Sequence, residues 1–434
     1  MIVITKFGGS SLSSAKQFAK VKKIIKADDK RKVVVCSALG KRNKEDSKIT
    51  DLLYILHAHL KYKVSYDEVW NVIYSRFTDV ERELKLDINI AADLDKLKSE
   101  LNKDISEEYL VSRGEYLTSK LMAAYLGFEF CDSKDLLKFN YDGKLDEEAT
   151  GKNIQDAFEK NHQMVVPGFY GSYPNGQVKL LSRGGSDITG SILAKYLGAS
   201  VYENWTDVSG ILAADPKVVE NPKAIKEITY TELRELSYMG ASVLHEETIF
   251  PVQSVNIPIN LRNTNEPDNP GTLIKNVCED TNTLVTGIAG KTDFISFDIY
   301  KDHMSNEVGF LRKAVEIFEK FNVSIEHIPS GIDSFSVVVS KDSVEKYQYD
   351  IIMELKNKLG AEVNIVNDIS LVAVVGRNMA KKSGICAKIF ETLGSNGINV
   401  RLLAQGPSEL NIIIGVAKVD YKKTINCLYN ALLG

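Results

Sequence analysis

A lysine and two adjacent glycines stand near the amino terminus, where a strand-like run ends. Lys6, Gly8, Gly9 and Ser10 follow the β-branched stretch 2–5, and a helical pattern comes after them. Glycine lets backbone N–H groups approach a ligand closely, and the start of a helix favours negative charge. These residues therefore predict an anion site, although a tight turn between strand and helix would also use them.

Several further short motifs carry polar residues that could join such a site. They are SRGE (112–115), SRGGSD (182–187), WTDVSG (205–210), ADPK (214–217) and GASVLH (240–245). The nearest approach to a P-loop, GIAGKT (287–292), has Val285 where that motif needs its first glycine. The sequence also lacks the protein-kinase and nicotinamide fingerprints. An anion site in this chain must therefore be built from separate motifs.

The elements that would position these residues alternate between strands and helices up to about residue 280. The run VVVCSA (33–38) is typical of a buried parallel strand, and 65–85 and 107–127 have helical periodicity. Such alternation predicts an α/β fold with a mainly parallel sheet, whose ligands lie beyond the carboxyl ends of the strands. Polar residues that follow strand-like runs should share one crevice: Lys6, Ser37, Arg183 and Thr206.

The last third of the chain contains an internal repeat with an offset of 75 residues. Gly309 falls on Gly384, and SFSVVV (334–339) falls on ELNIII (409–414). Each copy reads as a small βαββαβ unit, and the second copy lacks its last strand. The otherwise unpaired run TLVTGIAG (283–290) would supply that strand. We therefore predict domains at 1–282 and 283–434, with a first unit of about 291–367 inserted within a second unit, 283–290 plus 368–434.

Composition excludes several classes of protein. The chain has 434 residues, 44% of them hydrophobic, and a net charge of −4, which indicates two or three globular domains without affinity for nucleic acid or an acidic membrane. No apolar run is long enough to span a bilayer, and no signal peptide is visible. The cysteines are scattered without C-x-x-C pairs, so we expect reduced thiols and a cytoplasmic location.

Taken in order, KFGGSS, SRGGSD, WTDVSG and GASVLH resemble the aspartate kinases of the amino acid kinase family, and the repeats resemble their paired ACT domains. The resemblance covers nearly the whole chain. It implies a three-layer αβα sandwich followed by two ACT-like units. It also implies transfer of the ATP γ-phosphoryl group, with Mg²⁺, to the side-chain carboxylate of L-aspartate. The product would be 4-phospho-L-aspartate, in the biosynthesis of lysine, threonine and methionine.

That reaction suits a chain without histidine in its motifs. A carboxylate acceptor has an ordinary pKa near 3.9, so it is already a nucleophile at pH 7 and needs no general base. The obstacle is the repulsion between the carboxylate and the polyphosphate, which are both anions. Catalysis therefore requires that the protein position the two substrates and supply positive charge. We therefore expect Mg²⁺ to be held mostly by nucleotide oxygens and water, without a dedicated carboxylate cage.

The resemblance assigns a role to each motif residue. Lys6 and Asp187 would be catalytic, with Asp187 orienting Lys6, and Arg183 and Glu115 would bind the α-carboxylate and the α-ammonium of aspartate. The other substrate residues would be Ser37, Thr50 and Ser186. The nucleotide contacts would be Lys6, Gly8, Gly9, Ser10, Thr206, Asp207, Lys217 and Ser242. Taken singly, these residues could also be turn glycines, a helix N-cap or surface charges.

Three positions depart from the family pattern. Leu212 stands where a nucleotide-stacking tyrosine is common, Lys217 replaces an arginine, and Ser242 replaces a nucleotide-binding lysine. Acetylglutamate, glutamate, carbamate and UMP kinases are alternatives within the family. An alternative of a different functional class is a non-catalytic amino-acid sensor, in which the repeats bind the ligand and the kinase fold only relays the signal. The chain ends after the second repeat, so we expect the form without a fused homoserine dehydrogenase.

The paired repeats predict feedback by an end-product amino acid, with lysine favoured and threonine second. By resemblance the effector would bind in the first repeat, near the start of its helix and the following strand. The second repeat has Arg401 in the place of Glu326, so it should not bind the same cation equally. Sheet edges of such units suit a homodimer or a dimer of dimers. The predicted effector residues are Met304, Gly309, Phe310, Leu311, Ser324, Ile325 and Glu326.

Overall fold

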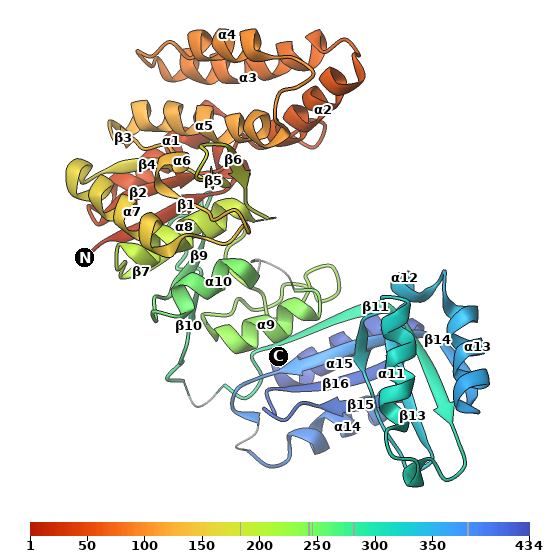
Figure 1. Cartoon of the computed structure of the whole chain (residues 1–434). Coiled ribbons are helices and arrows are strands. Elements are labelled where there is room, and N and C mark those ends of the chain that lie inside the picture. The colour runs from red at the N-terminus through yellow and green to blue at the C-terminus, as the bar shows by residue number, and fades with distance from the viewer. Residues whose placement is uncertain (183, 242–243, 245, 281–282, 380–381) are drawn as a thin grey trace. The chain divides into compact units, whose positions relative to one another are not determined.

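The computed structural model of the protein describes residues 1–434 except 183, 242–243, 245, 281–282 and 380–381. The chain divides into two compact units (Figure 1). The first contains Met1–Ile211, Lys226–Tyr230 and Val243–Cys278, and the second contains Leu212–Ile225, Thr231–Ser242 and Glu279–Gly434. The second unit thus includes two segments that precede the C-terminal repeats in the sequence.

The first unit is built on an eight-stranded sheet in the order β3-β4-β2-β1-β7-β9-β10-β8. Neighbouring strands from β3 to β9 in this order are parallel, whereas β10 is antiparallel to β9 and parallel to β8. The predicted mainly parallel sheet is confirmed. Its strands are β1 (Val3–Phe7), β2 (Arg31–Cys36), β3 (Glu129–Phe130), β4 (Met164–Pro167), β7 (Val201–Thr206), β8 (Glu227–Thr229), β9 (Ile259–Asn263) and β10 (Thr272–Lys275), and β5 (Tyr170–Ser172) and β6 (Val178–Leu180) form a separate hairpin.

Helices cover both faces of this sheet, which gives the expected αβα layers (Figure 1). One face carries α1 (Ala15–Lys26) and α5 (Glu107–Leu126), with α3 (Asp67–Leu84) and α4 (Ile90–Glu100) farther out. The other face carries α8 (Gly185–Tyr196). The remaining helices of the unit are η1 (Gly9–Leu12), α2 (Ile49–Tyr62), α6 (Ser133–Leu136), α7 (Glu147–Asn161) and α10 (Glu246–Gln253).

Local sequence explains these elements. The apolar run at the end of β2 is fully buried between the two helical layers, as its lack of alternation predicts. The helices predicted over 65–85 and 107–127 are confirmed as α3 and α5. Helix α5 begins after Ser106, whose side chain caps it, and ends at Gly127 with φ 73°, a conformation that glycine adopts without strain.

The second unit is built on a six-stranded antiparallel sheet in the order β12-β13-β11-β14-β16-β15. Two long strands belong to both halves of it. Residues 287–291 of β11 pair with 371–375 of β14, and 294–300 of β11 lie between β13 and the first part of β14. The strands are β11 (Gly287–Tyr300), β12 (Ile325–His327), β13 (Ser334–Ser340), β14 (Glu362–Val375), β15 (Leu402–Gln405) and β16 (Asn411–Ala417).

The helices of the second unit follow the 75-residue offset of the sequence. Gly309 and Gly384 precede α11 and α14, with φ 82° and 93°, and each helix has 11 residues. Helices α11 and α13 enclose an aromatic core in which Phe297 and Phe318 meet edge to face, 5.2 Å between ring centroids. The helices are η2 (Met304–Asn306), α9 (Tyr230–Tyr238), α11 (Phe310–Lys320), α12 (Lys341–Val344), α13 (Gln348–Leu359), α14 (Ile385–Ser395), η4 (Lys418–Asp420) and α15 (Tyr421–Leu432).

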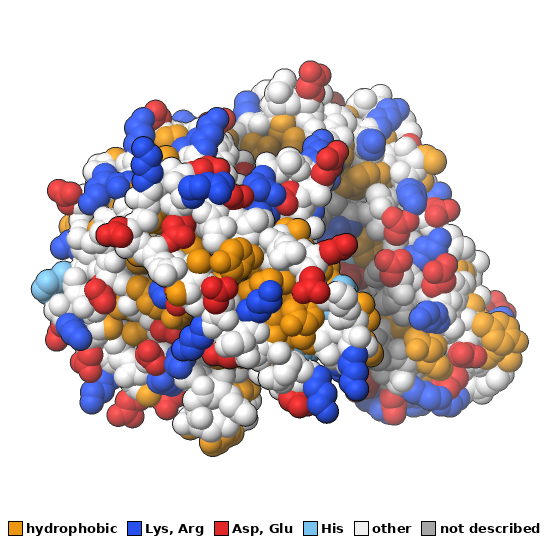
Figure 2. All heavy atoms as spheres, turned by 90° about the horizontal axis from the view of Figure 1, so that it is seen from above, with side chains coloured by type: hydrophobic (Ala, Val, Ile, Leu, Met, Phe, Trp, Pro, Cys, Tyr) orange, Lys and Arg blue, Asp and Glu red, His pale blue; other side chains and the backbone are white. Residues whose placement is uncertain are grey.

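The surface carries charges of both signs. Figure 2 shows acidic and basic side chains interspersed over the face seen from above, as the small net charge of −4 leads one to expect. Within the described residues, none of the helices is both long enough and apolar enough to cross a membrane.

Candidate active site

A cavity of about 1080 Å³ opens in the first unit, where the parallel strands end. Lys6 lies near the end of β1, Ser37 directly after β2, and Thr206 at the end of β7. These strands are neighbours in the order β2-β1-β7 and run in the same direction, so their carboxyl ends lie along one edge of the sheet. The cavity is large enough for a nucleotide-sized ligand.

Most residues predicted for the substrates line this cavity. They are Lys6, Gly8, Gly9, Ser10, Ser37, Thr50, Glu115, Ser186, Asp187, Thr206 and Asp207. Arg183 and Ser242 lie outside the residues that the structure describes. Lys217 belongs to the second unit. The structure therefore brings together the motifs of the first unit, and the roles of Arg183, Lys217 and Ser242 stay predictions.

Lys6 and Asp187 form a buried ion pair in the cavity. Only 8% of Lys6 is exposed, and its Nζ lies 2.5 Å from Oδ1 of Asp187. The same oxygen accepts a hydrogen bond of 2.9 Å from Nδ2 of Asn204. Asp187 lies in the first turn of α8 after Gly184, which has φ 78°. The carboxylate thus fixes the ammonium group at the end of β1.

Two loops meet at the predicted anion site. The N–H of Gly8 donates to the carbonyl of Trp205, and the N–H of Gly40 donates to the carbonyl of Gly9, at 3.0 and 2.9 Å. A Cβ on Gly40 would lie only 2.3 Å from the carbonyl carbon of Gly9. Glycine is therefore required where the segment after β2 crosses the segment after β1, because any side chain would push these loops apart.

Glu115 is the buried acid of the cavity. It lies on α5, is only 4% exposed, and its Oε2 has no hydrogen-bond partner within the part of the chain that the structure describes. Burial raises the pKa of Glu115 to about 8, although a backbone hydrogen bond from Ala38 and the charge of Lys6 act in the opposite direction. Burial thus favours the neutral acid at pH 7, and a cation that binds beside Glu115 would favour the carboxylate.

Sequence reasoning missed several residues of this site. Asn204 pairs in register with Lys6 across β7 and β1, which only strand pairing reveals. Phe169 lines the cavity just after β4 with φ 79°, a conformation that a bulky residue rarely adopts outside functional sites. Lys41 and Lys48 also line the cavity, and the sequence signal for them is the charged run KRNKEDSK (41–48), which begins shortly after β2.

The predicted effector residues all lie in the second unit. Met304 and Ile325 pack against the core cluster that contains Phe310, at the start of α11. Glu326 instead accepts a hydrogen bond from the Tyr238 hydroxyl and lines a separate hollow of about 420 Å³. Leu311 is exposed, Ser324 precedes β12, and Gly309 precedes α11. The apolar residues Met304, Phe310 and Ile325 thus belong to one core cluster, whereas Glu326 contacts helix α9.

Helix α9 contacts the six-stranded sheet of the second unit and its flanking residues through three side chains. Glu232 is fully buried and accepts hydrogen bonds from the backbone and guanidinium of Arg377 and from Thr286. Glu235 accepts from the amide of Asn411, and Tyr238 donates to Glu326. Helix α9 ends at Tyr238, two residues before Gly240 in the sequence.

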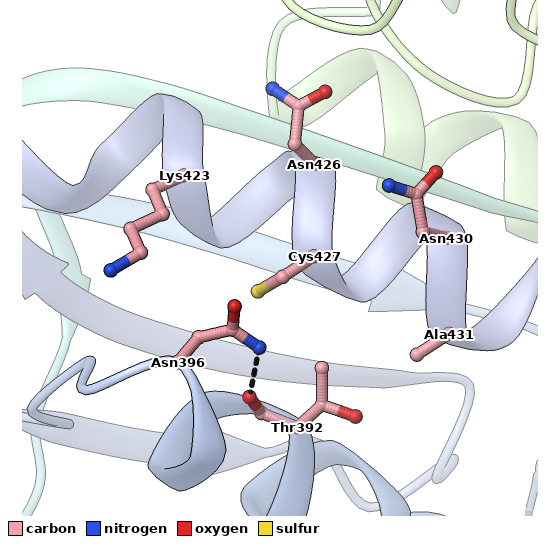
Figure 3. A pocket seen from close by; sticks show the side chains of 7 residues that line it. All are labelled: Thr392, Asn396, Lys423, Asn426, Cys427, Asn430 and Ala431. Atoms are coloured by element: carbon pink, nitrogen blue, oxygen red, sulfur yellow. Dashed lines mark hydrogen bonds between the residues drawn. The ribbon is translucent and has the colours of Figure 1, made fainter.

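A further pocket lies between α14 and α15 (Figure 3). Its lining is polar, with Asn396, Asn426, Asn430 and Lys423, and the Asn396 amide donates to the backbone carbonyl of Thr392 at 2.8 Å. None of the residues predicted for a ligand lines it. The cavity at the strand ends is therefore the better candidate for chemistry.

Known proteins resemble the chain over its whole length. Residues 1–263 match the amino acid kinase family, and residues 372–432 match an ACT domain family. Aspartokinase 3 of Bacillus subtilis is 36% identical over 98% of this chain and 97% of its own. The crystal structure of Clostridium acetobutylicum aspartate kinase, an allosteric enzyme, is 47% identical, with a TM-score of 0.93 over 99% of both chains.

Aspartokinase III of E. coli is a more distant relative with two informative crystal structures. Its complex with aspartate and ADP, in the R-state, is 25% identical with a TM-score of 0.75. Its complex with lysine and aspartate, in the T-state, is 26% identical with a TM-score of 0.78. Both matches cover 100% of this chain and of the relative.

Proposed function

Because the chain belongs to the aspartate kinases of the amino acid kinase family, we propose that it phosphorylates the side-chain carboxylate of L-aspartate at the expense of ATP. The observation that carries this proposal is the buried Lys6–Asp187 pair beside Gly8 and Gly9, in one cavity with the buried acid Glu115. Release of ADP that depends on L-aspartate, and not on glutamate or acetylglutamate, is the result that tests it.

The reaction needs no proton transfer. ATP supplies the phosphoryl group: an oxygen of the aspartate carboxylate forms a bond to the γ-phosphorus, the bond to the β–γ bridging oxygen breaks, and ADP leaves with the electron pair. Lys6 and the backbone around Gly8 and Gly9 offset the negative charge on the phosphoryl oxygens. Asp187 and Asn204 keep the ammonium group of Lys6 in place, which spares the cost of organising it during the reaction.

The acceptor is recognised by the residues around Glu115. The carboxylate of Glu115 pairs with the α-ammonium of aspartate, while Ser37, Thr50 and Ser186 line the same cavity. Arg183 is proposed for the α-carboxylate on the strength of the SRGGSD motif. Thr206 and Asp207 are proposed for the nucleotide, with Lys217 and Ser242 as further contacts. A buried acid for the ammonium selects a substrate with a free amino group, which disfavours acetylglutamate.

Mg²⁺ is proposed to accompany ATP. The cavity is lined by four carboxylates, Asp51, Glu115, Asp187 and Asp207, and Asp187 is held by Lys6 and Asn204. Within the described residues, no three His, Cys, Asp or Glu side chains are grouped so that they could hold a metal ion. We propose that phosphate oxygens and water provide most of the ligands, as is common for Mg²⁺ in kinases.

We propose a regulatory role for the paired repeats and keep the domain boundary at residues 282 and 283. The pairing of 287–291 with 371–375, next to β16, supports the insertion of the first repeat within the second. The match of 372–432 to an ACT domain family supports the nature of the second repeat. The even-numbered homo-oligomer expected from the sheet edges stays a prediction.

Lysine is the proposed feedback effector, since a lysine complex is known for E. coli aspartokinase III. We expect lysine to bind and inhibit, and threonine to do so much more weakly. Glu326→Gln should weaken lysine binding by roughly tenfold or more, because it replaces a hydrogen bond to a charged carboxylate with one to a neutral amide. Calorimetry and inhibition assays with both amino acids are the measurement.

Tyr238→Phe provides the matched control, because it removes the hydroxyl that donates to Glu326 and keeps the carboxylate. It should bind lysine at least as tightly as the wild type. Inhibition of the wild type by threonine alone would overturn the choice of lysine, and lysine binding that Glu326→Gln leaves unchanged would overturn the role of Glu326.

A further inference from the structure

A short segment that lines the cavity contains two lysines that have no role in the reaction proposed above for Lys6, Asp187 and Glu115. Residues 40–48, here called the strap, form most of the connection between β2 and α2 and include Lys41 and Lys48. Both lysines line the cavity. In the described part of the chain neither forms an ion pair, so their charges are available to a ligand.

The strap is held against the glycine turn after β1. The N–H of Gly40 donates to the carbonyl of Gly9 at 2.9 Å, and a Cβ on Gly40 would also lie 2.7 Å from the backbone nitrogen of Ser10. Lys41 follows directly in the chain. Its backbone is therefore fixed next to the proposed phosphate-binding residues Gly9 and Ser10, whereas Lys48 stands at the other end of the strap, two residues before Thr50.

A buried arginine on helix α3 holds the strap in place by hydrogen bonds. Arg76 of α3 is only 2% exposed, and its guanidinium donates to the carbonyl of Gly40 at 2.6 Å, to the carbonyl of Ser47 at 3.1 Å and to Oδ2 of Asp46 at 2.9 Å. Asp46 is held in turn by Arg42. The side chain of Arg76 thus hydrogen-bonds to Gly40 at one end of the strap and to Ser47 near the other. These bonds restrain the strap more than an ordinary surface loop is restrained.

The anionic ligands proposed for the cavity require more positive charge than Lys6 alone supplies, and Lys41 can provide it. Lys6 is already paired with Asp187 at 2.5 Å, so its charge is partly offset before any ligand binds. The triphosphate and the acceptor carboxylate are both anions, and their approach requires further positive charge.

We propose that Lys41 is a further catalytic residue, which contacts the transferring phosphoryl group, and that Arg76 is a positioning residue, which holds Lys41 at the glycine turn. This inference rests on the proposed aspartate kinase activity. During phosphoryl transfer, the ammonium group of Lys41 offsets the charge that the γ-phosphoryl oxygens carry while the bond to ADP breaks and the bond to the carboxylate forms. Lys41 gives up no proton in this step.

The first test compares Lys41→Met with Lys44→Met in the full-length protein. Lys44 lies on the same strap and is exposed, but it does not line the cavity. We expect Lys41→Met to lower kcat by about tenfold to thirtyfold, less than the loss of a fully buried donor, because Lys41 is exposed. Lys44→Met should stay within about twofold of the wild type.

The possible outcomes separate this inference from the proposed function. A wild-type protein without aspartate-dependent ADP release contradicts the proposed function itself. An active wild type, with equal kcat values for Lys41→Met and Lys44→Met, contradicts only the role of Lys41. A Lys41→Met variant that raises KM for aspartate with kcat unchanged would place Lys41 on the acceptor and overturn its contact with the phosphoryl group.

The second test concerns Arg76 and uses a double-mutant cycle. If Arg76 acts through Lys41, Arg76→Lys should lower kcat severalfold in the wild-type background and have little effect in the Lys41→Met background. Equal effects in both backgrounds would show that Arg76 supports the fold only. Asp46→Asn, which keeps both bonds from Arg76 to the backbone, provides a milder variant if Arg76→Lys does not fold.

Discussion

Lys6→Met should lower kcat by roughly two to four orders of magnitude and leave the protein folded, the scale expected for the loss of a preorganised charge in a closed site. Nζ of Lys6 lies 3.6 Å from the position that a Cβ on Gly8 would take, so the ammonium group is adjacent to the proposed phosphate site. KM for ATP should change much less than kcat, because the charge matters most where the phosphoryl group is transferred. Steady-state kinetics with a thermal unfolding curve is the measurement.

A control is needed because Lys6→Met leaves Asp187 without its ion-pair partner. A carboxylate stranded in a buried site can destabilise a protein by several kcal/mol. The double variant Lys6→Met with Asp187→Asn replaces that charge with an amide and should recover the unfolding temperature of the wild type without recovering kcat. Near-wild-type turnover in either variant would contradict the role of Lys6 in phosphoryl transfer.

Glu115→Gln should raise KM for aspartate by roughly two orders of magnitude, because it removes the charge that meets the α-ammonium in a buried site. The wild type should also show a characteristic pH dependence. The pKa of Glu115 is raised from its ordinary 4.5 to about 8, so below pH 8 most of the free protein carries a neutral acid. Aspartate must then displace that proton when it binds.

The sign of this pH effect follows from the raised pKa. As pH rises from 6 to 8 the carboxylate fraction of Glu115 grows, so KM for aspartate should fall by up to about tenfold per pH unit and level off above pH 8. Glu115→Gln should show no such slope, and Glu107→Gln, on the exposed first turn of the same helix, should keep it. A slope that persists unchanged in Glu115→Gln would show that another group titrates.

Much of this site could be predicted from the sequence, because its residues follow strand ends or lie in short motifs. Lys6, Ser37 and Thr206 were expected together since parallel strands place their carboxyl ends at one edge. Asn204 could not be expected, because its bond to Asp187 depends on the register between β1 and β7, which are almost 200 residues apart. A local pattern contains no information on such a register.

The same limit applies to the fold of the C-terminal part. The repeat predicted the elements of each half, and Gly309 and Gly384 both precede helices with a positive φ. It did not predict that β11 and β14 each run through both halves as single strands of 14 residues. Nor did it predict that α9 packs with the repeats, since the contacts of Glu232 with Arg377 join residues 145 positions apart.

Trapping of the acyl-phosphate product identifies the acid that accepts the phosphoryl group. The protein is incubated with ATP, Mg²⁺ and hydroxylamine, and with L-aspartate, L-glutamate or N-acetylglutamate in turn. Hydroxylamine converts an acyl phosphate into a stable hydroxamate, which mass spectrometry identifies. We expect aspartate β-hydroxamate in equal amount to the ADP released, and neither product with the other two acids. ADP release without a hydroxamate, or a hydroxamate formed from glutamate or N-acetylglutamate in preference to aspartate, would contradict this expectation.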